Sequence, residues 1–498
     1  MKKSGILLIM LLSVLTSTKA QNFDDALRYS QIFYTGSARF MSMGGAFTAL
    51  GGDLSAISLN PAGTAVFRSS EFSLTPQLYY NTTSSVWNGS KSKDAISLFN
   101  LNQIGIVSNI ISTNNEKGLV NLNIAYSYNR TNNFIENITI NGISNNSSMA
   151  DYWASSRANG HTKNDMPDDA WAAYQTGLID TLSGSNNSYG TVFSRYGDNP
   201  YSTYGQQIKR VITNTGYSGE HSFSIGANIS NKFFLGTTLG ISRIKYTGHL
   251  EHLESDVNNL IYDFKSFTYT DHLEATGTGY SLKLGAIIKP IEFLRIGLAV
   301  QSPTVYRITE NYYDDLSVHF DTKVNNVDSY EYSNNPASYK YTLTTPLRVN
   351  AGLAFQIKKL AIISADYEFV DYSTSRFSNA IDNLSFSAEN DSISANYKSA
   401  SNLRLGAELR LSNIYLRGGY SYYGKAFKSN TDNKNLDYSS VSFGIGFRQQ
   451  NFYFDLGCAL MSSSRLYFMY SDPGYLEPAS VATTRNTFTA TFGYKFGI

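Results

Sequence analysis

The last thirteen residues of the chain, NTFTATFGYKFGI, alternate between apolar and polar side chains without a break. Phe488, Phe492 and Phe496 fall on one face of an extended strand, and Thr489 and Thr491 fall on the other. A repeat of two residues is typical of a β-strand with one apolar and one polar face. Such a strand must place its apolar face against a protein core or against lipid.

The same alternation recurs along most of the chain and predicts about fourteen strands. They begin near residues 70, 94, 117, 219, 232, 268, 291, 339, 358, 400, 412, 438, 450 and 483. Very short turns join several of them, whereas longer polar connections lie at about 133–218, 313–338, 373–399 and 469–482. Short turns on one rim and long loops on the other are typical of an antiparallel transmembrane β-barrel, in which the long loops are extracellular.

The first twenty residues, MKKSGILLIMLLSVLTSTKA, have the features of a cleaved secretory signal. Lys2 and Lys3 precede an apolar run from Ile6 to Leu12, and Ala20 is a small residue at the expected cleavage site. The run is too short to cross a membrane as a stable helix. We therefore expect residues 1–20 to be removed and the mature chain to reach the bacterial outer membrane.

Composition agrees with a barrel and excludes two other classes. After the signal, no apolar run of about 20 residues occurs, which argues against a helical membrane protein. The signal carries three lysines and no acids, so the mature chain is close to neutral and offers no basic surface for nucleic acid. A stack of soluble β-sandwich domains would also explain the alternation, although it would not explain the signal and an aromatic face that continues to the last residues.

A glycine-rich segment precedes the first predicted strand. The stretch ARFMSMGGAFTALGGDLSAISLNPAG, residues 38–63, resembles the amino-terminal hatch of the FadL-type outer-membrane transporters, including its Asn-Pro-Ala signature. Segments at 296–308, 345–373 and 402–423 and the closing FTATFGYKF resemble the same family in the same order. The insertion at 133–218 is longer than the family pattern.

This resemblance implies a function and an organisation. It implies a hatch at 21–68 that plugs a barrel at 69–498, and passive uptake of hydrophobic small molecules such as long-chain fatty acids, with lateral release into the outer-membrane lipid. The alternative within the family is a carrier or anchor barrel that serves protein secretion. We expect a monomer without a cofactor and without enzymatic activity.

The hatch segment supplies the first group of candidate functional residues: Gly44, Gly45, Asp53, Asn60, Pro61, Ala62 and Gly63. Glycines permit positive φ and close approach to a barrel wall. Asp53 could cap a short helix over residues 54–59, and Pro61 would end that helix. The segment could be a static plug, or a hatch whose small shift opens a path; the resemblance favours the second.

The long connection contains a candidate ligand-binding helix. Pro167 and Asp168 suit a helix start, and Trp171, Tyr174 and Leu178 recur at helical spacing. This apolar stripe could pack the helix onto the barrel rim. Alternatively, it could be a landing surface for an apolar ligand.

No residue pattern indicates catalysis or a resident metal. Asp366 and Glu368 share the inner face of a predicted strand, where we expect them to pair with Arg404, Arg410 or Arg417 in a polar wall network. His249 and His252 are three residues apart on a predicted strand, which places them on opposite faces. Haem ligation by one of the six histidines is therefore an alternative without a motif to support it.

Overall fold

The computed structural model describes residues 23–113, 116–193, 203–324, 327–379, 385–472 and 475–497. Its main feature is a closed antiparallel barrel of fourteen strands, in which each strand pairs with the next and the last pairs with the first. In ring order these strands are β1 (Ser70–Trp87), β2 (Ser90–Ser112), β3 (Leu119–Asn133), β7 (Gln207–Ile229), β8 (Phe233–Ser255), β9 (Ser266–Ile291), β10 (Leu294–Gln301), β14 (Arg348–Ile357), β15 (Ala361–Asp371), β17 (Ser399–Leu411), β18 (Ile414–Tyr423), β19 (Tyr438–Gln449), β20 (Phe452–Tyr467) and β21 (Ala479–Phe496). The prediction of about fourteen antiparallel strands is confirmed. The predicted signal at 1–20 lies outside the described residues.

The predicted strand starts agree with the structure at most positions, because alternation is strong wherever one face meets lipid. The largest differences concern β7, which begins at Gln207, and β14, which begins at Arg348. In both regions extra pairing lengthens the wall on the side of the long loops. The additional strands there are β4 (Glu136–Ile143), β11 (Val305–Val324), β12 (Val327–Ser333), β13 (Ala337–Thr344) and β16 (Arg376–Asn379).

The outer face of the barrel carries an apolar band and then becomes polar. On β8, the outward side chains of Phe233, Leu235 and Leu239 are exposed, and the same face continues with the charged and exposed Arg243 and Lys245. About nine to eleven residues of a tilted strand cross a bilayer. The part of β8 beyond Arg243 therefore projects outside the membrane.

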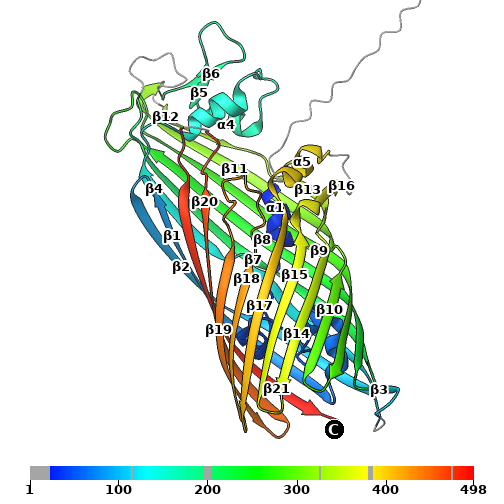
Figure 1. Cartoon of the computed structure of the whole chain (residues 1–498). Coiled ribbons are helices and arrows are strands. Elements are labelled where there is room, and N and C mark those ends of the chain that lie inside the picture. Colours follow the sequence, from blue (N-terminus) through cyan, green and yellow to red (C-terminus); the bar gives the residue numbers. More distant parts are fainter. Residues whose placement is uncertain are drawn as a thin grey trace, which may run out of the picture.

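The hatch lies inside the barrel, as Figure 1 shows in blue. It consists of α1 (Phe23–Ser30), α2 (Ala38–Ser42) and two 3₁₀ helices, η1 (Ala56–Ser58) and η2 (Pro61–Val66). Helix α1 lies toward the rim that carries the long loops, near α5 (Ser387–Asn396). The remaining hatch elements lie deeper, against the inner wall.

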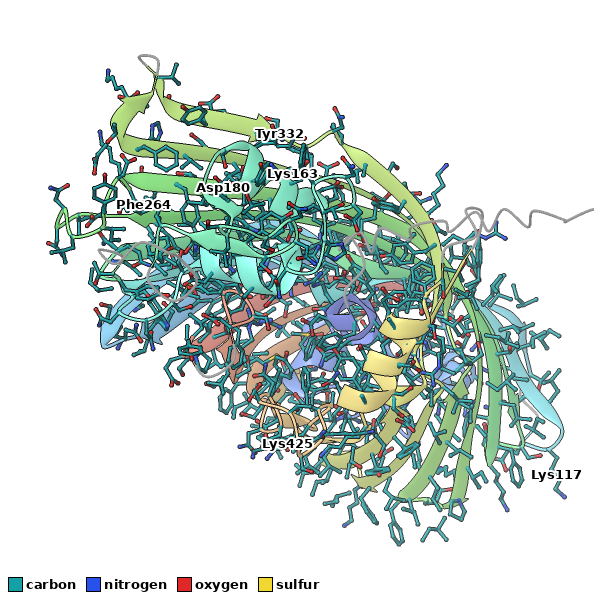
Figure 2. All side chains as sticks on the ribbon, turned by 90° about the horizontal axis from the view of Figure 1, so that it is seen from above. Lys117, Lys163, Asp180, Phe264, Tyr332 and Lys425 are labelled. Carbon is teal, nitrogen blue, oxygen red and sulfur yellow. The ribbon has the colours of Figure 1, made fainter. Side chains whose placement is uncertain are left out.

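A cap made by the longest connection covers one side of the barrel mouth (Figure 2). Its elements are α3 (Met149–Tyr152), the π-helix η3 (Trp153–Ala158), α4 (Asp168–Gln175) and the small β5 (Ile179–Thr181) and β6 (Tyr189–Thr191) pair. No helix in the described part of the chain has the length and apolar character needed to span a membrane. The cap shares an apolar core with the projecting part of the wall, and in this core Trp153 of the cap and Phe264 of the β8–β9 connection are fully buried.

Candidate functional site

The first part of the hatch is held together by Asp53. One carboxylate oxygen of Asp53 accepts a hydrogen bond from the Ser37 hydroxyl (2.7 Å), and the other accepts from the Ser55 backbone nitrogen (2.9 Å). Ser37 in turn caps α2, because its hydroxyl accepts from the Phe40 backbone nitrogen. Asp53 therefore joins two hatch segments besides starting the turn that leads into η1.

Asn60 and Pro61 form the second junction of the hatch. Oδ1 of Asn60 accepts from the Ala62 backbone nitrogen (3.0 Å), which caps η2. Nδ2 of Asn60 donates to the Thr48 carbonyl oxygen (2.6 Å) and, at 3.4 Å, to the Ala286 carbonyl oxygen of the wall strand β9. One side chain thus links two parts of the hatch to each other and to the barrel.

As expected, the helix before Pro61 ends ahead of it, with Leu59 as the C-cap of η1, and Pro61 in addition begins η2. The fixed φ of proline suits the first turn of a helix, where a missing N–H costs no hydrogen bond. The preceding helix is also shorter than expected and covers only Ala56–Ser58.

The predicted hatch glycines allow tight turns and close packing. Gly44 and Gly45 have φ of 61° and 73°, a region that other residues rarely adopt. Gly63 packs directly against Gly51, where a Cβ atom on Gly51 would come within 2.7 Å of the Gly63 Cα. These residues therefore let the hatch backbone fold onto itself without intervening side chains.

The inner wall contains a matching set of glycines, and no local pattern in the sequence distinguishes them from other glycines of the strands. At nine wall positions a Cβ atom would come within 3 Å of a hatch atom. We call this set the glycine girdle; its members are Gly226, Gly236, Gly285, Gly297, Gly352, Gly406, Gly419, Gly444 and Gly457. Each lies on a different strand, so the hatch packs against wall backbone around most of the barrel.

Charged side chains supplement this packing. Glu408 accepts from Arg39 of the hatch (2.9 Å) and from Arg417 of the neighbouring strand (2.8 Å), while Arg417 also donates to Asp455 (2.7 Å). Removal of one partner from an ion pair that is shielded from water strongly destabilises a protein, because the remaining charge is left uncompensated. The arrangement fixes the position of Arg39, and with it α2, relative to three wall strands.

The expected polar wall network is present around Asp366 and Glu368, and both side chains are buried inside the barrel. Glu368 pairs with Arg348 (2.8 Å) and with Arg404 (3.3 Å). Asp366 instead accepts from the backbone nitrogen (2.8 Å) and hydroxyl (2.7 Å) of Thr48. This second carboxylate therefore anchors the hatch, a role that the sequence did not indicate.

Two neighbouring cavities, which share part of their lining, lie above and beside the hatch. The larger one, here called the vestibule, has a volume of about 680 Å³ and is lined by α1, the wall and the loops on the long-loop side. The smaller one, the lower pocket, has a volume of about 60 Å³ and reaches Gly44 and Gly45. Both are lined by Phe33 and Arg485, which form part of the neck between them.

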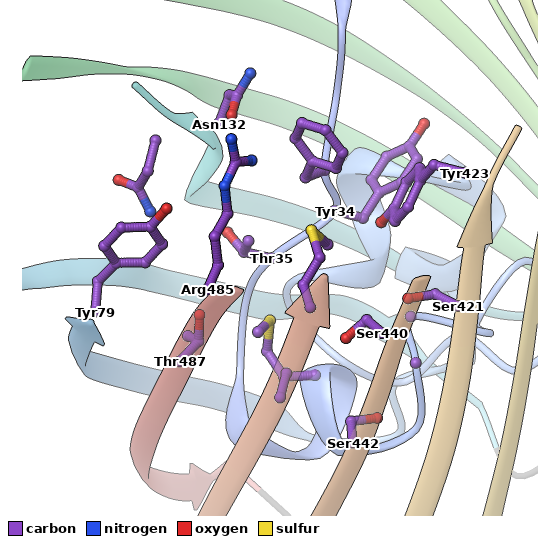
Figure 3. Close-up of a pocket in the computed structure, with 17 residues that line it drawn as sticks. Tyr34, Thr35, Tyr79, Asn132, Ser421, Tyr423, Ser440, Ser442, Arg485 and Thr487 are labelled. Atoms are coloured by element: carbon purple, nitrogen blue, oxygen red, sulfur yellow. The ribbon is translucent and has the colours of Figure 1, made fainter. Parts of the chain in front are cut away.

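Small inward side chains create the lower pocket. Figure 3 shows Ser421, Ser440 and Ser442 along its wall. Tyr34 and Tyr423 form another side. Its lining is more apolar than polar, whereas the vestibule exposes both kinds of surface in equal measure. An apolar group is therefore better accommodated below the neck than above it.

The predicted ligand-binding stripe belongs to the cap. Helix α4 begins at Asp168 as expected, and Trp171 stacks on Tyr174 with ring centroids 5.7 Å apart. Both rings are partly buried against the apolar core of the cap, and Leu178 is fully buried in it. None of these three residues lines the vestibule or the lower pocket. Ligand contact at Trp171 and Tyr174 stays a prediction.

The cap is fastened to the projecting end of β8 by Glu254. This carboxylate accepts from the Ser148 hydroxyl (2.7 Å), the Met149 backbone nitrogen (2.7 Å) and the Gln206 amide (3.0 Å). Burial raises the pKa of Glu254 to about 7. Burial, assisted by a nearby arginine, lowers the pKa of the adjacent His252 well below its usual value.

Within the described ranges, no group of three or more His, Cys, Asp or Glu side chains is arranged to hold a metal ion. His252 faces inward and contacts Glu254 (2.9 Å), while the His249 ring packs against the His272 ring in a tilted arrangement, with ring centroids 4.2 Å apart. The prediction that His249 and His252 occupy opposite faces is consistent with these contacts.

Comparisons with known proteins show which solved structures share this fold. Neither a family model nor a curated protein matches the sequence. The fold is similar to that of the CymD monoaromatic hydrocarbon channel, with a TM-score of 0.51 and 12% sequence identity over 94% of this chain and 98% of that one. It is also similar to a FadL homologue from Pseudomonas aeruginosa, with a TM-score of 0.55 and 11% identity, and to the toluene transporter TodX from P. putida, with a TM-score of 0.53 and 11% identity. Each of these last two comparisons covers 94% of this chain and 100% of the other.

This chain has the fold of the FadL-type barrels. At these identities the likeness concerns the fold alone. The glycine girdle, the Asn60 junction and the neck are described from the contacts of this chain alone, and not from its likeness to these structures.

Proposed function

We propose that this FadL-type barrel carries hydrophobic small molecules, such as long-chain fatty acids, passively across the bacterial outer membrane. The observation that carries the proposal is a wide vestibule that shares its lining at the neck with a mostly apolar lower pocket, which reaches the hatch at Gly44 and Gly45. The solved neighbours are named as a hydrocarbon channel and a toluene transporter, which supports transport in preference to catalysis.

The geometry suggests an order of events. A ligand enters the vestibule beside the cap, passes the neck at Phe33 and Arg485, and places its apolar part in the lower pocket. Burial of apolar surface there supplies about 25 cal/mol for each Å² removed from water. A modest shift of the hatch would then open the way onward, because the hatch closes the pocket at Gly44 and Gly45.

The alternative role, a carrier or anchor for secreted proteins, does not require an apolar pocket inside the barrel. The lower pocket therefore favours transport. No activity that breaks or forms covalent bonds is part of the proposal.

The proposal is tested by filling the lower pocket. Ser440→Trp places a large ring among the lining residues, whereas Ser439→Trp, on the same strand, points away from the pocket. We expect cells with wild-type protein to take up a labelled long-chain fatty acid faster than empty-vector cells, Ser440→Trp to lose most of that gain, and Ser439→Trp to keep it. Equal uptake by wild type and empty vector would reject transport of this ligand.

A further inference from the structure

One sector of the outer wall carries a group of basic side chains immediately above the apolar band. It is formed by β8, β9, β11 and β13, which are paired in this order and belong to the green part of the wall in Figure 1. On each of these strands alternate positions are buried toward the interior, so the positions between them face outward. We call this surface the basic patch; its members are Arg243, Lys245, Thr276, Thr278, Arg307, Thr309, Lys340 and Thr342.

The strand register arranges the basic patch in two rows. In the lower row, Thr278 of β9 lies opposite Arg243 of β8 on one side and opposite Arg307 of β11 on the other. Neighbouring strands lie about 5 Å apart, so the backbones of Arg243 and Arg307 are roughly 10 Å apart and both long side chains can reach one group placed over Thr278. In the upper row two lysines flank two threonines, and in strand order these residues are Lys245, Thr276, Thr309 and Lys340.

The apolar band ends directly below the lower row. One step toward the short-turn rim, the outward side chains of the same strands are Ile241, Tyr280 and Val305, and the band continues with Leu239 and Leu282. All of these except the half-buried Ile241 are exposed. Since the exposed apolar side chains face the hydrocarbon, the basic patch lies at the level of the headgroups of the outer leaflet.

The cations of the basic patch have no acidic partner in the described part of the chain. Arg243, Lys245, Arg307 and Lys340 are all exposed, and none of them forms an ion pair or a side-chain hydrogen bond with another described residue. The nearest acidic side chain on this outer face is Glu274, which lies one step beyond the upper row and further from the membrane. The two rows therefore present four positive charges and no negative charge.

The opposite side of the barrel has no such rows. On β17 to β21, the outward residue that follows the upper end of the apolar band is uncharged on every strand. These residues are Ser401, Tyr422, Ser439, Ser462 and Asn486. The basic patch is therefore a local feature of one sector and not a general property of the membrane boundary.

The chemistry and the position of the basic patch favour a phosphorylated lipid as its occupant. A guanidinium binds a phosphate through paired, charge-assisted hydrogen bonds, and a threonine hydroxyl between two arginines can donate another. An anionic group bound here lies directly above lipid chains, because the apolar side chains of Tyr280 and Val305 follow at once below it. A lipid satisfies both conditions in one molecule, with its phosphate on the basic patch and its acyl chains along the band.

We propose that the basic patch binds the phosphate-bearing headgroup of an outer-leaflet lipid, whose acyl chains lie along the apolar band below it. This lipid site is on the outside of the barrel, separate from the vestibule and the lower pocket, and it does not depend on the transport function proposed above. Because β8, β9 and β11 leave the membrane at this level, a bound headgroup braces the base of the projecting wall.

The test measures binding of bis-phosphorylated lipid A to the purified full-length barrel by native mass spectrometry in a neutral detergent. The matched probe is the same lipid after removal of both phosphates. Each basic residue near an anionic lipid surface contributes about a fivefold gain in affinity. We expect wild type to bind the phosphorylated lipid more tightly than the dephosphorylated one by a factor of about twenty-five or more. Arg243→Gln combined with Arg307→Gln should weaken binding of the phosphorylated lipid about twenty-fivefold and leave binding of the dephosphorylated lipid unchanged.

A second pair of exposed lysines provides the matched control. Lys91→Gln combined with Lys93→Gln removes the same charge from outward positions of β2 and should behave as wild type. Equal affinity of wild type for the two lipids would overturn the inference, and this comparison needs no variant to assemble. An equal loss in the β2 variant would also overturn it, because any pair of outer charges would then suffice. Displacement of the lipid by inorganic phosphate, beyond that caused by sodium chloride of the same ionic strength, would assign the basic patch to a soluble anion and likewise overturn it.

Discussion

Gly419 of the wall and Gly44 of the hatch are packed backbone against backbone, so that a Cβ atom on Gly419 would overlap the Gly44 nitrogen. A Cβ atom on the adjacent Gly418 would have no such neighbour within 4 Å. This difference between two neighbouring glycines gives a direct test of the glycine girdle.

We predict that Gly419→Ala destabilises the hatch–wall contact by about 1–3 kcal/mol, the usual cost of overpacking, whereas Gly418→Ala has little effect. Hydrogen exchange of residues 38–45 reports on the hatch itself, and the temperature of heat-modifiable migration reports on the barrel. Faster exchange in Gly419→Ala alone is the expected result. Equal behaviour of the two variants would show that the hatch is not seated against this part of the wall.

We predict that changes at the Asn60 junction alter transport and leave barrel assembly normal. Asn60→Ala combined with Pro61→Ala removes the cap of η2 and the bond to the Thr48 carbonyl oxygen, at a cost on the order of 1–3 kcal/mol. We expect normal barrel assembly and a changed rate of fatty-acid uptake, because the population of hatch positions shifts. Asn60→Ser, which can keep the cap but cannot reach Thr48, should give an intermediate effect. Unchanged uptake at several ligand concentrations in both variants would remove the reason to assign Asn60 a gating role.

The outer apolar band predicts which surface positions tolerate charge. Phe492 is exposed on the apolar band, whereas Thr484 is exposed on the same face of β21 in a polar region. An arginine near the bilayer midplane costs about 2–4 kcal/mol. Phe492→Arg should therefore reduce the fraction of folded protein in outer membranes, and Thr484→Arg should not. Thr491 is unsuitable as the control, because its buried hydroxyl accepts from the Ala38 backbone nitrogen of the hatch (2.7 Å).

The buried Glu254 predicts a pH-dependent cap. Its folded-state pKa of about 7 lies above the ordinary glutamate value of 4.5, so the folded form holds the proton more tightly than the unfolded form. The contribution of Glu254 to stability is thus fully present below pH 4.5, declines as the pH rises to 7, and falls by about 3 kcal/mol in total. His252 has the opposite dependence, since its lowered pKa removes stability as the pH falls below 6.5.

Comparison with Glu254→Gln isolates the carboxyl group from His252. We expect the difference in cap stability between wild type and Glu254→Gln to decrease from pH 4.5 to 7 and then stay constant. Glu251→Gln, on the outer face of the same strand, serves as the matched control. The rate of proteolytic cleavage within residues 144–206 is the measurement, and a pH-independent difference would contradict the assignment.

The wall was predictable because each of its strands meets lipid on one face and the interior on the other. Phe488 and Phe492 could be placed outside, and Asp366 and Glu368 inside, from alternation alone. Helix α4 was predictable at its start, where Pro167 and Asp168 favour initiation, but not at its end. The chain leaves the helix after Gln175, and Gly177 takes a φ of 73°, so Leu178 does not continue the helical stripe.

The neck and the girdle were not predictable because they depend on contacts between distant segments. Phe33 and Arg485 are separated by most of the chain, and nothing near either residue indicates the other. Arg485 could be assigned to the inner face of its strand, together with Thr487 and Thr489, but its place at the neck is a property of the assembled barrel. The role of Gly419 likewise appears only when the hatch is in place.

The most direct test of passage through the neck is photo-cross-linking of a long-chain fatty acid with a diazirine in its tail, in intact outer membranes. We predict adducts on lower-pocket residues, Tyr423 and Met461 above all, and we expect an excess of unlabelled fatty acid to suppress them. Adducts found only on lipid-facing residues such as Phe443 and Leu456, with none in the pocket, would contradict it.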